Sequence, residues 1–168
     1  MTIICTTLPR DIFESELFGY VNGVVSGAAT NKARLIENKA ENEKLFLDEI
    51  NELADDTQSK LLRVLEKGVY FKLGDSRERN ALFRLITASN KNLTDSANRF
   101  RQDLYYRITG VMFDHPCLSD RKKDISLLVE AFLSKSDYAY NKNVHSVSMR
   151  AMDALRNHNW PGNFRELK

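Results

Sequence analysis

The sequence predicts an α/β fold with a parallel sheet, followed by a smaller helical lobe. Short β-favouring runs alternate with helical patterns up to about Pro116, whereas only helical patterns follow. The apolar run at 45–47 has the composition of a buried strand and ends in two carboxylates. We therefore expect an α/β domain over 1–116 and a helical lobe over 117–168.

Each element is predicted by its apolar pattern and by the proline, glycine or capping residues at its ends. Strands are expected at 2–6, 45–47, 69–73 and 82–88, the first of them closed by Pro9. A helix is expected at 11–18, where Gly19 can end it. Asp55 and Gln58 can form a capping box for a second helix that Gly68 ends.

The helical lobe has its own signals. Asp124 begins a helix whose apolar residues recur at i, i+3, i+4, i+7 and i+8, and Ser148 can cap another. Asn163 and Glu166 suggest a capping box for a helix at the end of the sequence. We expect helices to make up this lobe.

Composition narrows the class of protein. With 168 residues, 42% hydrophobic and 29% charged, the chain can form a real core. A net charge of +2 is too mild to indicate a nucleic-acid surface. Cys5 and Cys117 lack zinc or redox spacing, no signal peptide is evident, and no apolar run approaches the roughly 20 residues that span a bilayer. We expect a cytoplasmic protein with reduced thiols.

The adjacent carboxylates of Asp48 and Glu49 are the strongest chemical signal. Ligands of open α/β sheets bind outside the carboxyl ends of parallel strands, where such a pair can hold Mg²⁺ and polarise a water. The alternative is an ordinary solvated strand end. No G-x-x-x-x-G-K-[ST] stretch occurs between Met1 and Lys168, so the usual cradle for nucleotide phosphates is absent from this sequence.

Other polar residues could complete a nucleotide site. If strand 82–88 is parallel and adjacent to 45–47, Asn90 lies beside Glu49; otherwise it is a turn residue. Arg101 and Arg107 would lie about 120° apart on a continuous helix and could not share one face of it; if the helix ends near Tyr106, both could still reach a neighbouring subunit. Both could equally be surface charge. Arg165 could contact phosphate or simply lie at a lobe interface.

Together these segments resemble the central AAA+ domain of bacterial enhancer-binding proteins, the activators of RNA polymerase that carries sigma-54. The resemblance spans nearly the whole chain. It rests on the ordered motifs ESELFG (14–19), LFLDEI (45–50), Q-x-K-L-L-R-V-L (58–65), T-A-S-N (87–90), RFRQDLYYRI (99–108) and WPGNFREL (160–167).

The resemblance implies a RecA-like AAA+ parallel sheet with a helical lid, ATP and Mg²⁺ as ligands, and ring assembly with nucleotide between subunits. Asp48, as metal ligand, and Glu49 would form the Walker B pair, and Asn90 the first sensor. Arg101 and Arg107 would be arginine fingers, and Arg165 the second sensor. The sigma-54 contact loop would comprise Gly23, Val24, Val25, Ser26, Gly27 and Ala28.

The sequence departs from the family pattern at several places. The phosphate-binding loop lies upstream of Met1 in the family, so we expect a fragment or a truncated product with an incomplete sheet. Ile4 stands where the family has an Asn that restrains the Walker B glutamate. The contact loop reads GVVSGA instead of GAFTGA, and the glycine pair between Glu37 and Leu45 is missing.

These observations favour a sigma-54-interaction AAA+ domain that couples ATP hydrolysis to remodelling of the polymerase, with incomplete machinery. A rival interpretation is a non-enzymatic regulatory or oligomerisation module without sigma-54 contact. A third is a decayed remnant, because a sheet without its first strand exposes an edge. Direct DNA binding has no support within these residues.

Overall fold

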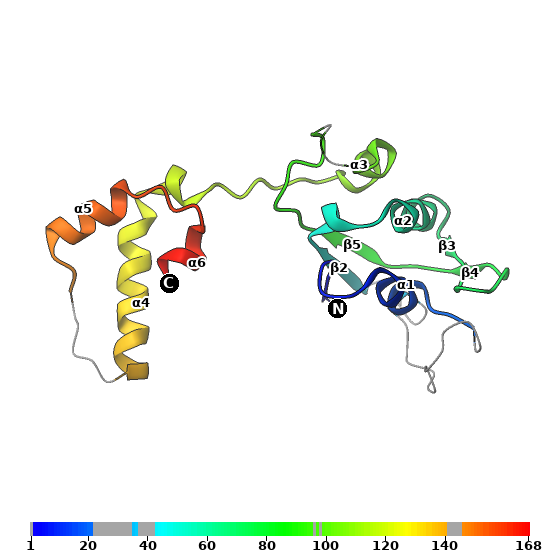
Figure 1. Cartoon of the computed structure of the whole chain (residues 1–168), viewed down its shortest axis with the longest axis horizontal. Coiled ribbons are helices and arrows are strands. Elements are labelled where there is room, and N and C mark those ends of the chain that lie inside the picture. Colours follow the sequence, from blue (N-terminus) through cyan, green and yellow to red (C-terminus); the bar gives the residue numbers. More distant parts are fainter. Residues whose placement is uncertain (1, 22–34, 37–42, 96, 98, 141–145) are drawn as a thin grey trace. The chain divides into compact units, whose positions relative to one another are not determined.

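The computed structural model describes residues 2–21, 35–36, 43–95, 97, 99–140 and 146–168. The chain divides into two compact units, Met1–Met112 and Phe113–Lys168 (Figure 1). Each unit contains its own cluster of buried apolar side chains. Among the described residues, no helix combines the length and apolar character needed to cross a membrane.

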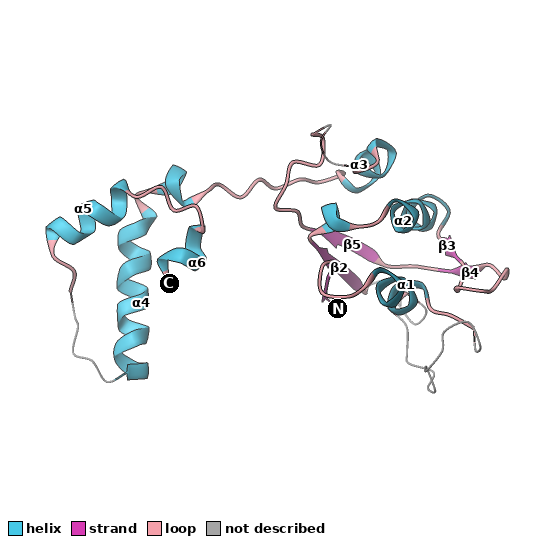
Figure 2. Cartoon of the chain, in the orientation of Figure 1, coloured by secondary structure: helices cyan, strands magenta, loops and turns pink. Residues whose placement is uncertain are grey.

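A parallel sheet organises the first unit. Strand β2 (Lys44–Asp48) lies between β1 (Thr2–Ile4) and β5 (Arg84–Thr87), as Figure 2 shows for β2 and β5. Leu45 and Leu47 point to the same face of β2 and are fully buried, whereas Phe46 on the opposite face is only partly buried. The parallel, adjacent arrangement that we considered for strand 82–88 is thus confirmed.

Two helices pack beside this sheet. Helix α1 (Arg10–Phe18) ends at Gly19, and α2 (Asp55–Lys67) ends at Gly68, as expected. Gly68 has φ +68°, a conformation that glycine adopts without steric penalty. Buried Glu14 of α1 accepts hydrogen bonds from Thr57 Oγ1 and Lys60 Nζ of α2, both at 2.6 Å. The ESELFG segment therefore anchors α1 to α2.

The hairpin after α2 differs from the prediction. Strand β3 covers only Val69–Tyr70 and pairs antiparallel with β4 (Arg79–Asn80), which lies between the strands expected at 69–73 and 82–88. The carboxylate of Asp75 organises the turn by accepting hydrogen bonds from Arg77 N at 3.1 Å and Arg79 Nη2 at 3.3 Å. These contacts, led by the Arg77 backbone N–H, lower the pKa of Asp75.

The predicted capping box of α2 is wrong, because Gln58 has a different role. The N-cap residue is Ala54, and it makes no side-chain cap hydrogen bond. Gln58 is buried; its Nε2 donates to the carbonyls of Leu53 (2.8 Å) and Arg99 (3.3 Å), and its Oε1 accepts from Arg101 N (2.8 Å). The amide therefore fixes the start of α3 (Gln102–Ile108) against α2.

The second unit is helical in its described part, as predicted. It contains the 3₁₀ helix η2 (Leu118–Arg121) and helices α4 (Asp124–Tyr140), α5 (Met149–Asn157) and α6 (Asn163–Leu167). Its buried core consists of Leu118, Ile125, Val129 and Trp160. The Ser148 cap is confirmed by a 3.3 Å hydrogen bond from Ala151 N to Ser148 Oγ.

The predicted capping box at Asn163 and Glu166 is shifted by one residue. Gly162 is the N-cap, and its N–H donates to Glu166 Oε2 at 2.7 Å. Asn163 instead uses Oδ1 to accept from Leu118 N at 2.8 Å. Asn163 joins α6 to η2 because the backbone N–H of buried Leu118 needs an acceptor.

We expect Gln58→Leu to lower the free energy of unfolding of the first unit by about 2 kcal/mol, because it leaves buried backbone groups without partners. Denaturant unfolding, followed by far-UV circular dichroism, measures the loss. Gln102→Leu, at an exposed position, is the matched control and should change stability little. Equal effects of the two substitutions would contradict this role of Gln58.

Candidate functional site

The carboxyl ends of β2 and β5 form the candidate site. Backbone hydrogen bonds join them: Ala88 N donates to Leu47 O at 2.9 Å, and Ile50 N donates to Ala88 O at 3.0 Å. Between these bonds the chain turns sharply, because Glu49 adopts a left-handed conformation with φ 56° and ψ 45°. Such a conformation is unusual for a residue other than glycine and is typical of functional turns.

Asp48 is fixed by its backbone while its carboxylate stays partly exposed. Its carbonyl accepts from Cys5 N at 2.9 Å, and its Oδ1 accepts from Glu49 N at 3.0 Å. Within the described part of the chain, Oδ2 has no hydrogen-bond partner. One carboxylate oxygen is therefore available to a hard cation, and Mg²⁺ commonly uses one or two carboxylates with water and phosphate oxygens.

Glu49 has a partner that the sequence did not reveal. Thr6 Oγ1, just beyond the end of β1, donates to Glu49 Oε2 at 2.5 Å. The contact depends on the strand register, in which Ile4 lies opposite Asp48. The available signal was a threonine at the end of a predicted strand, and it is too common to identify such a role.

Asn90 lies at the expected end of β5, on the exposed surface. Its neighbours are anchored to the 3₁₀ helix η1 (Ile50–Glu52): Ser89 Oγ bonds to Asn51 Oδ1 at 2.9 Å, and Lys91 Nζ pairs with Glu52 at 2.7 Å. Hydrogen bonding to Lys91 also lowers the pKa of Glu52. The Asn90 side chain itself makes no hydrogen bond with the described residues, so it remains available to a ligand.

No group of three or more His, Cys, Asp or Glu side chains that could hold a metal ion occurs among the residues that the structure describes. The site at β2 offers the two carboxylates of Asp48 and Glu49. This donor set fits a cation whose remaining ligands are waters and phosphate oxygens.

Arg101 and Arg107 both make contacts within the chain. Arg101 precedes α3 and binds the Asp103 carboxylate at 3.0 and 2.7 Å and Ser59 Oγ at 3.1 Å; the Asp103 contact raises the pKa of Arg101. Arg107 donates to Leu65 O at 3.2 and 2.7 Å. Helix α3 runs from Gln102 to Ile108, so Arg101 precedes it and the helical angle assumed between the two arginines does not apply to them.

Arg165 lies in α6 of the second unit and is exposed. The preceding residue, Phe164, lines a surface hollow of about 560 Å³ together with Arg121 and Leu128. Arg121 Nε is buried and has no hydrogen-bond partner among the described residues. The predicted contact loop at 23–28 lies outside the described residues.

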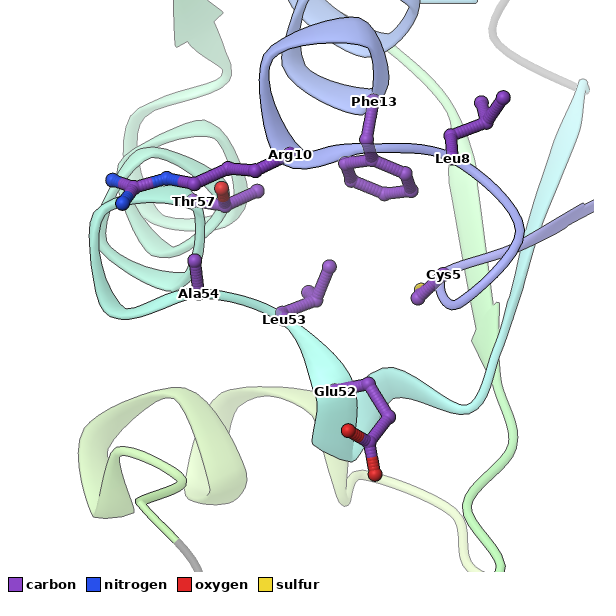
Figure 3. A pocket seen from close by; sticks show the side chains of 8 residues that line it. All are labelled: Cys5, Leu8, Arg10, Phe13, Glu52, Leu53, Ala54 and Thr57. Atoms are coloured by element: carbon purple, nitrogen blue, oxygen red, sulfur yellow. The ribbon is translucent and has the colours of Figure 1, made fainter.

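A small cavity beside the site is not large enough for a nucleotide. It has a volume of about 100 Å³, whereas small-molecule sites usually measure roughly 300–1,000 Å³. Phe13 and Leu53 project toward it in Figure 3, with Cys5 beside it. Burial, followed by the Asp48 and Glu49 carboxylates, raises the pKa of the Cys5 thiol to about 12.

Comparison with known proteins identifies the family. Residues 1–114 match the model of the Sigma-54 interaction domain, and residues 119–168 match that of the AAA+ ATPase lid domain. The chain belongs to the Sigma-54 interaction domain family. The resemblance inferred from the ordered motifs is therefore confirmed.

Similar proteins are bacterial transcription regulators. The chain is 42% identical to the transcriptional regulator VasH of Vibrio cholerae, with 100% of this chain and 32% of VasH covered. It is 41% identical to XylR of Pseudomonas putida and 39% identical to NtrC of Rhizobium meliloti, with 100% of this chain covered and 30% and 35% of those proteins. The chain thus spans about a third of the length of these relatives.

Solved structures confirm the AAA+ fold. NtrX from Brucella abortus in complex with ATP matches 99% of this chain and 36% of its own length, with a TM-score of 0.81 and 29% identity. Hsp104 from S. cerevisiae matches 99% of this chain and 33% of its own, with a TM-score of 0.63 and 19% identity. The second likeness concerns the fold alone.

We expect Cys5 to resist alkylation at pH 8 in the folded chain, because its thiol is buried and protonated and only the thiolate is a good nucleophile. Exposed Cys117 should react readily. Mass spectrometry after brief iodoacetamide treatment measures both, and the unfolded chain serves as control, in which both should react. Equal modification of the two thiols in the folded chain would disprove the protected state.

Proposed function

We propose that this chain forms part of the AAA+ ATPase domain of a sigma-54-dependent transcription activator. The observation that carries the proposal is the pair Asp48 and Glu49 at the carboxyl end of the middle strand, directly beside the end of β5. This is where a nucleotide binds in open α/β folds. Membership of the Sigma-54 interaction domain family supports the same assignment.

Asp48 and Glu49 would have different roles, one in binding the metal ion and the other in activating water. Asp48 would hold Mg²⁺ through its available Oδ2, because Mg²⁺ favours carboxylate and water ligands. The cation would neutralise negative charge on the phosphates. Glu49 would orient and polarise the attacking water, and Asn90, at the end of the neighbouring strand, would read the γ-phosphate or position that water.

These 168 residues contain no G-x-x-x-x-G-K-[ST] stretch, so a phosphate cradle of that type would be supplied by other residues. Strand β5 offers a place for it. Among the described residues β5 pairs only with β2, and Ile86 on β5 is 40% exposed. A further parallel strand along that edge would bring its phosphate loop beside Asp48 and Asn90. ATP bound to NtrX supports ATP as the nucleotide.

The arginines would act around the same nucleotide. We propose that Arg101 and Arg107 serve as arginine fingers for a neighbouring subunit of a ring, after release from Asp103 and Leu65. Arg165 would act as second sensor from the helical lid, where it is exposed on α6. The α/β subdomain would cover 1–116 and the lid 117–168.

The proposed partner is RNA polymerase that carries sigma-54. The contact loop would be GVVSGA at 23–28, where Val25 and Ser26 replace the Phe and Thr of the family pattern. A phenyl ring buries roughly 150 Å² or more in an interface, whereas valine offers less surface. The loop should therefore bind sigma-54 weakly.

The ATPase proposal is tested by joining the segment that precedes the matched region of NtrX to this chain. The fusion should bind and hydrolyse ATP, and Glu49→Ala should abolish hydrolysis while preserving binding, because it removes only the water-polarising carboxylate. The 168 residues alone, as control, should show no micromolar ATP binding in calorimetric titration.

Mixing Arg101→Ala subunits with Glu49→Ala subunits of the fusion should restore some ATPase activity, because one interface of a mixed ring then has both residues intact. A fusion that binds ATP but hydrolyses it equally well without Glu49 would refute the assignment.

We further expect Val25→Phe with Ser26→Thr to increase capture of sigma-54 by the same fusion. The added ring supplies an aromatic anchor, and such anchors contribute about 2 kcal/mol or more where they act as hot spots. A pull-down with a nucleotide transition-state analogue measures the gain. Val25→Leu, which adds apolar volume without a ring, is the control. If the native loop captures as much sigma-54 as the double substitution, the loop is fully competent.

A further inference from the structure

Glu49 is tied to the neighbouring strand by one hydroxyl group. The segment Cys5–Thr7 leaves β1 and passes over the end of β2, where Cys5 N donates to Asp48 O at 2.9 Å. A tight turn follows, in which Thr7 N and Thr7 Oγ1 both donate to Ile4 O, at 3.2 and 2.7 Å. This turn leaves Thr6 facing Glu49, and its Oγ1 donates to Glu49 Oε2 at 2.5 Å.

The backbone of Glu49 has little freedom. Its N–H donates to Asp48 Oδ1 at 3.0 Å, its carbonyl accepts from Glu52 N at 3.0 Å, and the next residue is bonded to Ala88 of β5. With φ at 56°, the residue is committed to one turn conformation. What remains variable is the side chain, whose direction is set by its hydrogen-bond partner.

The sheet order gives this bond a direction. Thr6 follows β1, whereas Asn90 follows β5, and β2 lies between these strands. A carboxylate bonded to Thr6 is therefore drawn toward β1, on the side opposite the end of β5. Ile4 cannot provide such a contact because its side chain has no hydrogen-bond donor.

We propose that Thr6 is the positioning residue of Glu49 in this protein. Its hydroxyl holds the carboxylate toward β1 and must release it before Glu49 can orient a water near Asp48 and Asn90. This inference rests on the proposed role of Glu49 as the water-polarising carboxylate. A hydroxyl suits this task because an uncharged donor holds a carboxylate less firmly than an arginine or lysine would.

The side-chain carboxyl ¹³C resonance of Glu49 provides the direct test on the 168-residue chain. Glu49→Gln identifies the resonance by removing it. Thr6→Val should move the resonance, because the carboxylate loses its donor, and Thr6→Ser should leave it near its original position. Thr7→Val is the matched control, because it deletes the neighbouring hydroxyl, which bonds to Ile4 O, and it should not move the resonance. Thr6→Ala serves if Thr6→Val alters the amide spectrum broadly.

A Mn²⁺ titration reports on release of the carboxylate. If Thr6→Val frees Glu49 to join Asp48 as a ligand, Mn²⁺ should bind at least about threefold more tightly, since affinity follows the number of charged ligands. Glu49→Gln should remove that gain. An unmoved Glu49 resonance in Thr6→Val, or an equal movement in Thr7→Val, would overturn the inference. Absence of Mn²⁺ binding at Asp48 in every variant would instead refute the proposed metal site, while the resonance would still decide the role of Thr6.

Discussion

The position of β2 between two parallel neighbours is the constraint on which the rest of the first unit depends. Its buried leucines hold it in the core, and its two edges fix the register of β1 and β5. Backbone hydrogen bonds from Cys5 to Asp48 and from Ile50 to Ala88 extend this pairing past the strand ends. Three chain segments that are far apart in sequence therefore meet beside two carboxylates. A slip of one residue would reverse the direction of every side chain in β2 and remove Asp48 and Glu49 from the site.

A second constraint is the buried amide of Gln58. It satisfies backbone groups at Leu53, Arg99 and Arg101, so α2 determines where α3 begins. Glu14 plays a comparable part between α1 and α2, where it receives both a hydroxyl and an ammonium donor. Buried polar groups of this kind are expensive to leave unpaired, and they therefore specify one arrangement of the helices. The motifs ESELFG and Q-x-K-L-L-R-V-L thus have a structural role, holding the helices together, that is independent of catalysis.

The proposed catalytic groups differ in how firmly they are held. Asp48 and Glu49 follow a buried strand and have fixed backbones, whereas the Asn90 side chain is exposed between two anchored neighbours. Arg101 and Arg107 are bonded within the chain, and an action on another subunit requires those contacts to break. Since exposed ion pairs contribute little stability, the exchange of Asp103 for a phosphate is energetically modest. Such contacts would allow the proposed site to assemble and to release as nucleotide and neighbouring subunits bind and dissociate.

The sequence by itself determined the fold class, the family and the positions of the acidic pair and Asn90. It could do so because an apolar strand followed by carboxylates is a local pattern, and because the motifs occur in a distinctive order. The helix ends at Gly19 and Gly68 were predictable for the same local reason. Only the tertiary structure decided the partners of Gln58, Asn163 and Glu49, because each partner comes from a segment distant in sequence. Local patterns suggested capping boxes for the first two, but a buried backbone N–H needing an acceptor took precedence. Thr6 became significant only when strand register placed it beside Glu49.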